Sequence, residues 1–488
     1  MRSVLALVAA SMVLCCVGSG LGQPVGQFPF ALTREGQMLG AVEGEVASFK
    51  GLPYAAPPVD ALRWRPPQPT VESSEMRTAY DYGAPCLQPS LPGASEDCLT
   101  LNVFRPFGVD GPMPVMVFIH GGGFVTGTAN DPLFDGARLA QAGLIVVTVN
   151  YRLGVPGWLA HPALSEGGSG NYGLMDQIAA LHWVHDNIAA FGGDPNNVTL
   201  FGNGAGATSI ALLMLCRQAH GLFQKAILQS LPGRATLHSP QEVELVSADV
   251  VGGLASEPDL RAVPPAKLLA AEERLLTKFT RALGPAIDGS LVTEDIAAGF
   301  TAGHQSRIPV IIGSNDDETR VGNESDVDLA SPDGMIDGLR QLYPDVSKPA
   351  ELKARFYTDK VFSEPARLLA RRHAAIGAPA FRYRFGYVPE ARRASPDRGH
   401  GRELQFIFGA EGVPGAGIFS RGDREVARRM RGYWINFARS GDPNGRGLPR
   451  WDAATDRDRL LLVTNDGIAS GDDPFAERLD RIAGESRK

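Results

Sequence analysis

A run of alternating glycines between two apolar segments is the feature that most constrains how this chain can fold. Residues 198–201 (Val-Thr-Leu-Phe) predict a buried parallel strand, because they are short, β-branched and apolar. Residues 205–216 contain no proline and no glycine besides Gly206, and their apolar character predicts a buried helix. Gly202, Gly204 and Gly206 permit close packing and positive φ angles around the turn. The segment therefore predicts a tight strand–turn–helix unit of an α/β protein.

The turn has the spacing of G-x-S-x-G, the elbow that carries a nucleophilic serine, but Gly204 stands at the serine position. The central residue of such an elbow is usually strained, by about 1–3 kcal/mol when it has a Cβ. Glycine removes that strain and also removes the hydroxyl. We therefore expect Gly204 to stabilise the fold while deleting the attacking atom.

Two long stretches carry a family resemblance. Residues 191–202 read Phe-Gly-Gly-Asp-Pro-Asn-Asn-Val-Thr-Leu-Phe-Gly, and residues 95–103 read Ser-Glu-Asp-Cys-Leu-Thr-Leu-Asn-Val. Both stretches resemble signatures of the type-B carboxylesterase and cholinesterase family of α/β-hydrolases. The chain departs from that pattern at Asn203, where relatives usually have glutamate, and at Gly204, where they usually have serine.

The resemblance extends from about Gly26 to about Gly467. It implies an α/β-hydrolase fold, with a mostly parallel central sheet flanked by helices and with helical cap insertions. We expect a single carboxylesterase-type domain over residues 23–488. The Ala-, Glu- and Leu-rich segment at about 231–307 predicts one helical insertion, and residues 324–376 predict a second.

Other segments agree with a doubly wound sheet. Continuous apolar runs at residues 115–119 and 144–149 predict central strands. Residues 173–190 predict a helix with one apolar face, and residues 40–54 predict an antiparallel hairpin or edge.

The N-terminus predicts a secretory signal over residues 1–22. Arg2 precedes an apolar stretch at 4–17, and the small residues at 20–22 suit a cleavage site. A membrane anchor would need a longer apolar run. The prediction is a secreted or periplasmic protein without a membrane span after cleavage. The net charge of −7 and the lack of a basic run argue against nucleic acid as a partner.

A glycine run follows the predicted strand at 115–119 and reads His120-Gly121-Gly122-Gly123-Phe124. Such a run lets backbone N–H groups converge on a developing oxyanion. By family resemblance, the oxyanion donors are the N–H groups of Gly122, Gly123 and Ala205. A flexible strand-end turn is the plainer interpretation.

The resemblance also implies an acid and a base. Glu318 lies just beyond a predicted strand, where the family has its triad carboxylate, and Asp316 and Asp317 are local competitors. His400 opens the segment His-Gly-Arg-Glu-Leu-Gln-Phe-Ile-Phe-Gly, which resembles the family's histidine loop. The order elbow, acid, base is that of α/β-hydrolases.

Cysteines and histidines elsewhere predict structural roles. By resemblance, Cys86 and Cys98 form a disulfide, which loop entropy makes worth roughly 3 kcal/mol. Cys216 is left over and predicts a buried thiol. His182 and His185 are spaced as a pair on a helix, but no third ligand is evident nearby, so we expect no metal and no cofactor.

Two functions are consistent with these residues. The first is a carboxylic-ester hydrolase with weak or lost activity, because an acyl–serine intermediate cannot form at Gly204. The second is a non-catalytic secreted binding protein on the same scaffold, as in the neuroligin-type members, which also carry glycine at the elbow. Thr208, Ser209 and Ser230 show no evident path to both His400 and the oxyanion donors. The expected ligand is a small carboxylic ester or a related apolar molecule, and the lack of Trp between Cys86 and Cys98 disfavours choline esters.

Overall fold

The computed structural model describes residues 28–161, 170–234, 237–254, 259–278, 283–319, 338, 340–393, 399–414, 416–454 and 458–485. The predicted signal at 1–22 and the first part of the predicted insertion at 324–376 lie outside these residues.

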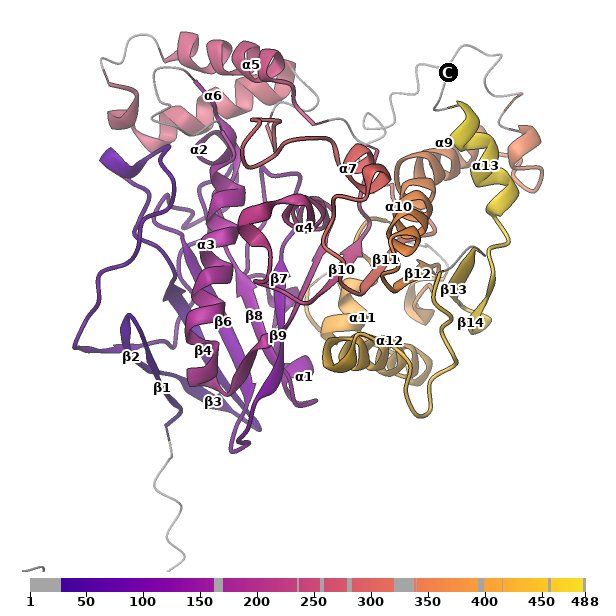
Figure 1. Ribbon diagram of the computed structural model, residues 1–488, viewed down its shortest axis with the longest axis horizontal. Helices are drawn as coiled ribbons and strands as arrows, with labels where there is room; N and C mark the ends of the chain where they lie inside the picture. Colours follow the sequence, from indigo (N-terminus) through magenta and orange to yellow (C-terminus); the bar gives the residue numbers. More distant parts are fainter. Residues whose placement is uncertain are drawn as a thin grey trace, which may run out of the picture.

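An eleven-stranded sheet runs through the molecule (Figure 1). In spatial order its strands are β14 (Gly467–Asp472), β13 (Arg459–Thr464), β12 (Ala380–Phe385), β11 (Val310–Asn315), β10 (Lys225–Gln229), β9 (Gly193–Asn203), β7 (Met113–Ile119), β8 (Ile145–Val149), β6 (Thr100–Pro106), β4 (Val46–Pro53) and β3 (Ala41–Glu43). Pairing is parallel from β13 to β8 and antiparallel at both ends. A separate sheet contains β1 (Phe30–Thr33), β2 (Gly36–Leu39) and β5 (Met76–Thr78).

Helices cover both faces of the large sheet (Figure 1). The α-helices of the described part of the chain are α1 (Ala137–Ala140), α2 (Gly154–Trp158), α3 (Tyr172–Asn187), α4 (Ala205–Leu215), α5 (Pro240–Gly253), α6 (Pro265–Lys278), α7 (Ile296–Ala302), α9 (Pro349–Thr358), α10 (Glu364–Ala375), α11 (Leu404–Phe408), α12 (Arg421–Ser440) and α13 (Ala476–Glu485). A π-helical turn, η7 (Asp359–Ser363), joins α9 to α10.

The central strands are apolar along their whole length because both of their faces are buried. In β7, Val115 and Val117 pack into the core on the side of α3 and α4, whereas Met116 and Phe118 pack into the core beneath α11 and α12. Side chains on alternate strand positions point to opposite faces, so each core takes every second residue. A mostly parallel sheet covered on both faces is the α/β-hydrolase architecture that the sequence predicts.

The observed elements differ from the predicted ones mainly at their ends. Strand β9 begins at Gly193 rather than Val198, and Pro195 lies where the β7–β9 register shifts. Proline is tolerated at such an irregularity because it donates no ladder hydrogen bond. The helix predicted at 173–190 ends at Asn187 and tightens into a 3-10 turn before Gly192, whose φ is +81°. A left-handed glycine is a common helix stop.

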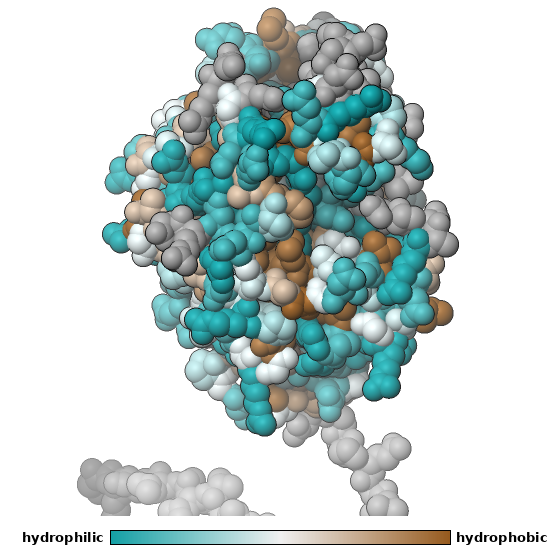
Figure 2. Space-filling model, turned by 90° about the vertical axis from the view of Figure 1, so that its right-hand side faces the viewer, coloured by the Kyte–Doolittle hydropathy of each residue, from teal (hydrophilic) through white to brown (hydrophobic). Residues whose placement is uncertain are grey.

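The described residues contain a covalent cross-link, and one face of the molecule is largely hydrophilic. Cys86 and Cys98 form a disulfide, and Cys216 is a buried free thiol. Figure 2 shows a face on which hydrophilic residues predominate, with short apolar areas between them. Within the described part of the chain, none of the helices has the length and apolar character needed to span a bilayer.

Helix α6 contributes a buried carboxyl to the main body. The Oε2 atom of Glu272 accepts a hydrogen bond from the N–H of Val155 at 2.9 Å. A Cβ on Gly154, whose φ is +55°, would lie 2.0 Å from the same oxygen, so only glycine fits there. Burial raises the pKa of Glu272 to about 7, which the Val155 N–H opposes and the charge of Glu273 reinforces.

We predict that the wild type loses stability as the pH rises through neutrality, and that Glu272→Gln does not show this loss. Because the folded-state pKa exceeds the ordinary value, the stabilising contribution of the protonated acid is full below about pH 4.5 and is lost as the pH rises through about 7. Between pH 5 and pH 8 the wild type should lose about 3 kcal/mol relative to the variant. Denaturant unfolding at both pH values measures this difference, and Glu244→Gln, at an exposed position on α5, is the matched control. Parallel pH profiles for wild type and Glu272→Gln would contradict it.

Candidate functional site

The centre of the site is the turn between β9 and α4. Strand β9 ends at Asn203 and α4 begins at Ala205, with Gly204 between them at φ +57°. A Cβ on Gly206 would lie 2.0 Å from the carbonyl oxygen of Ile119, and one on Gly202 would lie 2.6 Å from it. The turn is therefore pressed against the end of β7, and glycines make that approach possible.

Gly204 faces the imidazole of His400. A Cβ built on Gly204 would lie 2.6 Å from Nε2 of His400, closer than real Cβ contacts. The N–H of Gly204 donates to the carbonyl of Gln229 at 2.9 Å, which holds the turn to β10. The imidazole thus lies directly beside the position where a side chain would begin.

His400 is paired with Glu318. The Nδ1 atom lies 2.7 Å from Oε2 of Glu318, whose side chain is fully buried. The other oxygen, Oε1, accepts from the N–H of Asn315 at 2.6 Å and from Oγ of Ser230 at 2.7 Å. Because a carboxylate accepts hydrogen bonds, this pairing favours the tautomer with the proton on Nδ1 and leaves a lone pair on Nε2.

The described remainder of the second predicted insertion packs against this pair. Phe362 of η7 lies beside the imidazole of His400, with 5.4 Å between ring centroids. The hydroxyl of Thr358, at the end of α9, accepts from the N–H of Glu318 at 3.0 Å. The His400 side chain is 16% exposed, so its free nitrogen lies at the boundary between the buried acid and the outside.

The glycine run predicted to bind an oxyanion lies next to the turn. A Cβ on Gly121 would lie 2.6 Å from the carbonyl oxygen of Asn203, so the two segments touch. Gly122 has φ +117° and Gly123 has φ +64°. Among the described residues, the N–H groups of Gly122 and Gly123 show no hydrogen-bond partner, and Ala205 begins a helix, where N–H groups lack intrahelical acceptors. Unpaired donors at this place are what an oxyanion site requires.

A second carboxyl lies under the turn. Oε1 of Glu403 accepts from Nε2 of Gln229 at 2.8 Å and is 3.4 Å from Nδ2 of Asn203. Glu403 is fully buried, and burial raises its pKa, with the negative charge of Glu318 adding to the rise. Asn203 therefore places a neutral amide, rather than a carboxylate, next to Glu403.

The hydroxyls considered as substitutes for the missing serine are occupied elsewhere. Oγ1 of Thr208 donates to the carbonyl of Gly204 at 3.1 Å, and Oγ of Ser209 accepts from Gln177 at 3.0 Å. Ser230 donates to Glu318, a role that sequence reasoning missed although Ser230 directly follows the neighbouring parallel strand β10. Asp317 instead accepts from the N–H of Thr319 at 3.0 Å.

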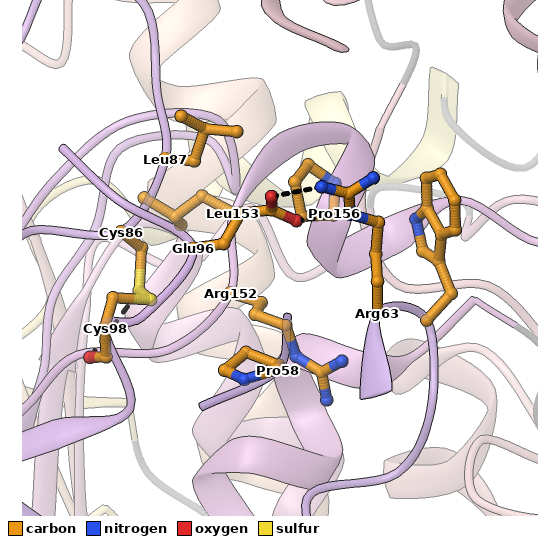
Figure 3. Close-up of a pocket in the computed structure, with 10 residues that line it drawn as sticks. Pro58, Arg63, Cys86, Leu87, Glu96, Cys98, Arg152, Leu153 and Pro156 are labelled. Carbon is orange, nitrogen blue, oxygen red and sulfur yellow. Dashed lines mark hydrogen bonds and ion pairs between the residues drawn. A yellow bond between two sulfur atoms is a disulfide. The ribbon is translucent and has the colours of Figure 1, made fainter. Parts of the chain in front are cut away.

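A small pocket beside the disulfide shares no residue with this group (Figure 3). It is lined by Pro58, Arg63, Trp64, Cys86, Leu87, Glu96, Cys98, Arg152, Leu153 and Pro156. Its two guanidinium groups are already paired, Arg63 with Glu96 at 2.7 Å and Arg152 with Asp176 at 2.7 Å. The ion pairs fix the loops around the disulfide. Among the described residues no group of three or more potential metal ligands occurs, and His182 and His185 are exposed.

Comparisons with known proteins cover nearly the whole chain. The family model named Carboxylesterase family matches residues 27–337 and 339–480. The para-nitrobenzyl esterase of Bacillus subtilis (strain 168) is 36% identical over 482 residues, covering 92% of this chain and 97% of the relative. The fumonisin B1 esterase of Sphingopyxis macrogoltabida is 36% identical over 481 residues, covering 90% and 87%. A solved PNB esterase structure superposes with a TM-score of 0.84 at 34% identity, covering 93% of this chain and 100% of that one.

We predict that Gly204→Ala destabilises the protein more than Gly123→Ala does. Both glycines have positive φ angles, so both substitutions add backbone strain of about 1–3 kcal/mol. A Cβ at Gly123 meets nothing within 4 Å, whereas a Cβ at Gly204 also displaces the imidazole of His400. Denaturant unfolding of the two variants measures the difference. Equal losses would mean that the imidazole does not occupy the space beside Gly204.

Proposed function

Because the chain belongs to the carboxylesterase family, we propose that it is a carboxylic-ester hydrolase of strongly reduced activity. In this proposal Gly204 stands at the nucleophile position, His400 is the base, and Glu318 orients it. Two contacts support the proposal. Nε2 of His400 faces Gly204, and Nδ1 of the same ring lies 2.7 Å from the buried carboxylate of Glu318. The N–H groups of Gly122, Gly123 and Ala205 are the proposed oxyanion donors.

The magnitude of the loss follows from the missing hydroxyl. Removing the nucleophile from a serine triad lowers turnover by about 10⁶, or roughly 8–9 kcal/mol of barrier. About 10³–10⁴ over the reaction in water can persist from oxyanion stabilisation and binding alone. Esters with good leaving groups need the least help, so they are the proposed substrates. The relatives are named as esterases, which supports carboxylic esters as the substrate class.

A non-catalytic binding protein is the second candidate. The observation that favours it is Gly204 itself, because Thr208, Ser209 and Ser230 use their hydroxyls in internal hydrogen bonds. The protein would then hold an ester or a related apolar ligand without cleaving it. A complete lack of ester turnover by pure protein, together with measurable binding of an unreactive ester analogue, would favour this second candidate.

We also propose that the protein functions outside the cytoplasm. The disulfide between Cys86 and Cys98 supports this, since such bonds persist in oxidising compartments. The predicted signal at 1–22 supplies the export route. Determination of the N-terminal residue of protein recovered from the native host tests the proposal, because a mature chain that retains residues 1–22 would contradict it.

We predict slow, His400-dependent hydrolysis of a small aryl acetate. His400→Ala should abolish the enzyme-dependent rate, because among the described residues the three atoms nearest to a Cβ on Gly204 all belong to His400. Exposed His185→Ala is the matched control and should keep the wild-type rate. The measurement is release of para-nitrophenol at several enzyme concentrations. A rate unaffected by His400→Ala would remove the assignment of the base.

We predict that Gly204→Ser combined with Asn203→Glu increases ester hydrolysis by about 10³-fold or more. The added hydroxyl supplies the attacking oxygen, and the glutamate restores the residue that usually precedes it in the family. The imidazole must move back to admit the new Cβ, so the increase should be accompanied by lower stability. Steady-state kinetics and thermal unfolding measure both effects. A folded but inert double variant would overturn the site assignment.

A further inference from the structure

Nε2 of His400 lies too close to Gly204 to act as a general base for a hydroxyl carried by a side chain at that position. A general base needs its proton donor about 2.6–3.2 Å away. Here that distance separates Nε2 from the position of a Cβ, one bond short of where a hydroxyl oxygen would be. The imidazole therefore lies nearer to this position than a serine side chain would allow, and Nε2 stands directly beside the turn.

The hydrogen bonds at the other end of the ring favour a lone pair on this nitrogen, and the side chain that carries it is partly exposed. Glu318 holds Nδ1 at 2.7 Å, and its other oxygen is fixed by Ser230 and Asn315, so the carboxylate cannot turn away. The proton on Nδ1 leaves Nε2 unprotonated. The side chain is 16% exposed, whereas that of Glu318 is fully buried.

We propose that Nε2 of His400 is itself the nucleophile, and that the protein hydrolyses activated esters through an acyl-imidazole on this residue. The inference rests on the proposed ester hydrolysis and specifies its first step. Histidine is among the side chains that form covalent intermediates in enzymes. At this site its nitrogen lies beside the turn whose next N–H, that of Ala205, starts α4.

The two steps balance as follows. The Nε2 lone pair attacks the acyl carbon, an N–C bond forms, and the carbonyl oxygen becomes an oxyanion near the unpaired N–H groups of Gly122 and Gly123. The carbonyl re-forms as the C–O bond to the leaving group breaks, and that group departs as its anion. The resulting acyl-imidazolium keeps its Nδ1 proton, held by Glu318. Water then adds to the acyl carbon and loses one proton to solvent, and the N–C bond breaks to regenerate the neutral imidazole. The carboxylic acid that leaves gives its own proton to solvent.

This first step selects a substrate class. An imidazole leaves a tetrahedral intermediate far more readily than an alkoxide does, so an alkyl ester would return to starting material. A phenolate or thiolate competes with imidazole as a leaving group. The inference therefore assigns aryl esters and thioesters to this site and excludes simple alkyl esters.

Direct activation of water by His400 makes different predictions. Water attack leaves no acyl group on the protein, and proton transfer in that step produces a normal solvent deuterium isotope effect. Attack by Nε2 moves no proton in the acylation step, so the isotope effect on leaving-group release should be close to absent. The presence of an adduct and the isotope effect therefore separate the two routes.

The experiment is a single-turnover reaction of the full-length protein with para-nitrophenyl acetate. Acid quench is followed by intact-mass and peptide mass spectrometry, with release of para-nitrophenol followed in H₂O and D₂O. We expect an acetyl-sized increment on His400, a burst of para-nitrophenol, and no hydrolysis of ethyl acetate. Gly204→Ala should slow the burst by about tenfold or more, because its Cβ displaces Nε2 from the turn. His185→Ala should react as the wild type does.

Each outcome decides the inference. Turnover that requires His400 but gives no acetylated peptide, with a normal isotope effect, overturns the inference and leaves the proposed hydrolysis intact. An increment on any other residue also overturns it. An adduct on His400 that never hydrolyses supports the inference and overturns the proposed turnover. Neither turnover nor adduct overturns both. Peptide mapping of the wild type gives these answers even if His400→Ala fails to fold.

Discussion

The contact of the β9–α4 turn with the end of β7 positions everything else in the site. The Ile119 carbonyl oxygen lies so close to Gly206 and Gly202 that neither position has room for a Cβ. This approach brings the start of α4 beside the glycine run that follows β7, and it directs Gly204 toward the histidine loop. Because the strands around it are parallel, β10 and β11 deliver Ser230 and Asn315 to the same edge of the sheet. Glu318, His400 and the unpaired N–H groups of Gly122 and Gly123 therefore gather at one edge.

Much of this arrangement could be predicted from the sequence. The glycine spacing between two apolar runs predicted the β9–α4 turn. Strands that are apolar on both faces predicted a parallel sheet that is covered on both sides. Glu318 and His400 came from family resemblance, because a lone acid or histidine carries no local signal of its role. The structure places His400 beside Gly204 and Glu318 within 2.7 Å of the far nitrogen of its ring.

The parts that sequence reasoning missed depend on contacts between distant segments. Phe362 packs on His400 because a π-helical turn connects α9 to α10, and no periodic pattern indicates such a turn. Glu403 lies inside the recognised histidine segment, yet its burial against Gln229 and Asn203 becomes visible only when three segments meet. Thr358 and Ser230 orient Glu318 through single hydrogen bonds, which leave no trace in composition or spacing.

The left-handed backbone at Gly204 has a consequence for the evolution of this chain. The φ of +57° is freely available to glycine, and the imidazole lies within 2.6 Å of the position that a Cβ would take. A serine here would have to adopt an unfavourable dihedral angle and displace the ring at the same time. A single substitution to serine would therefore fit poorly at this position. Substitutions that keep glycine at the turn disturb neither the backbone nor the ring, so they are more accessible to this chain than a change to serine.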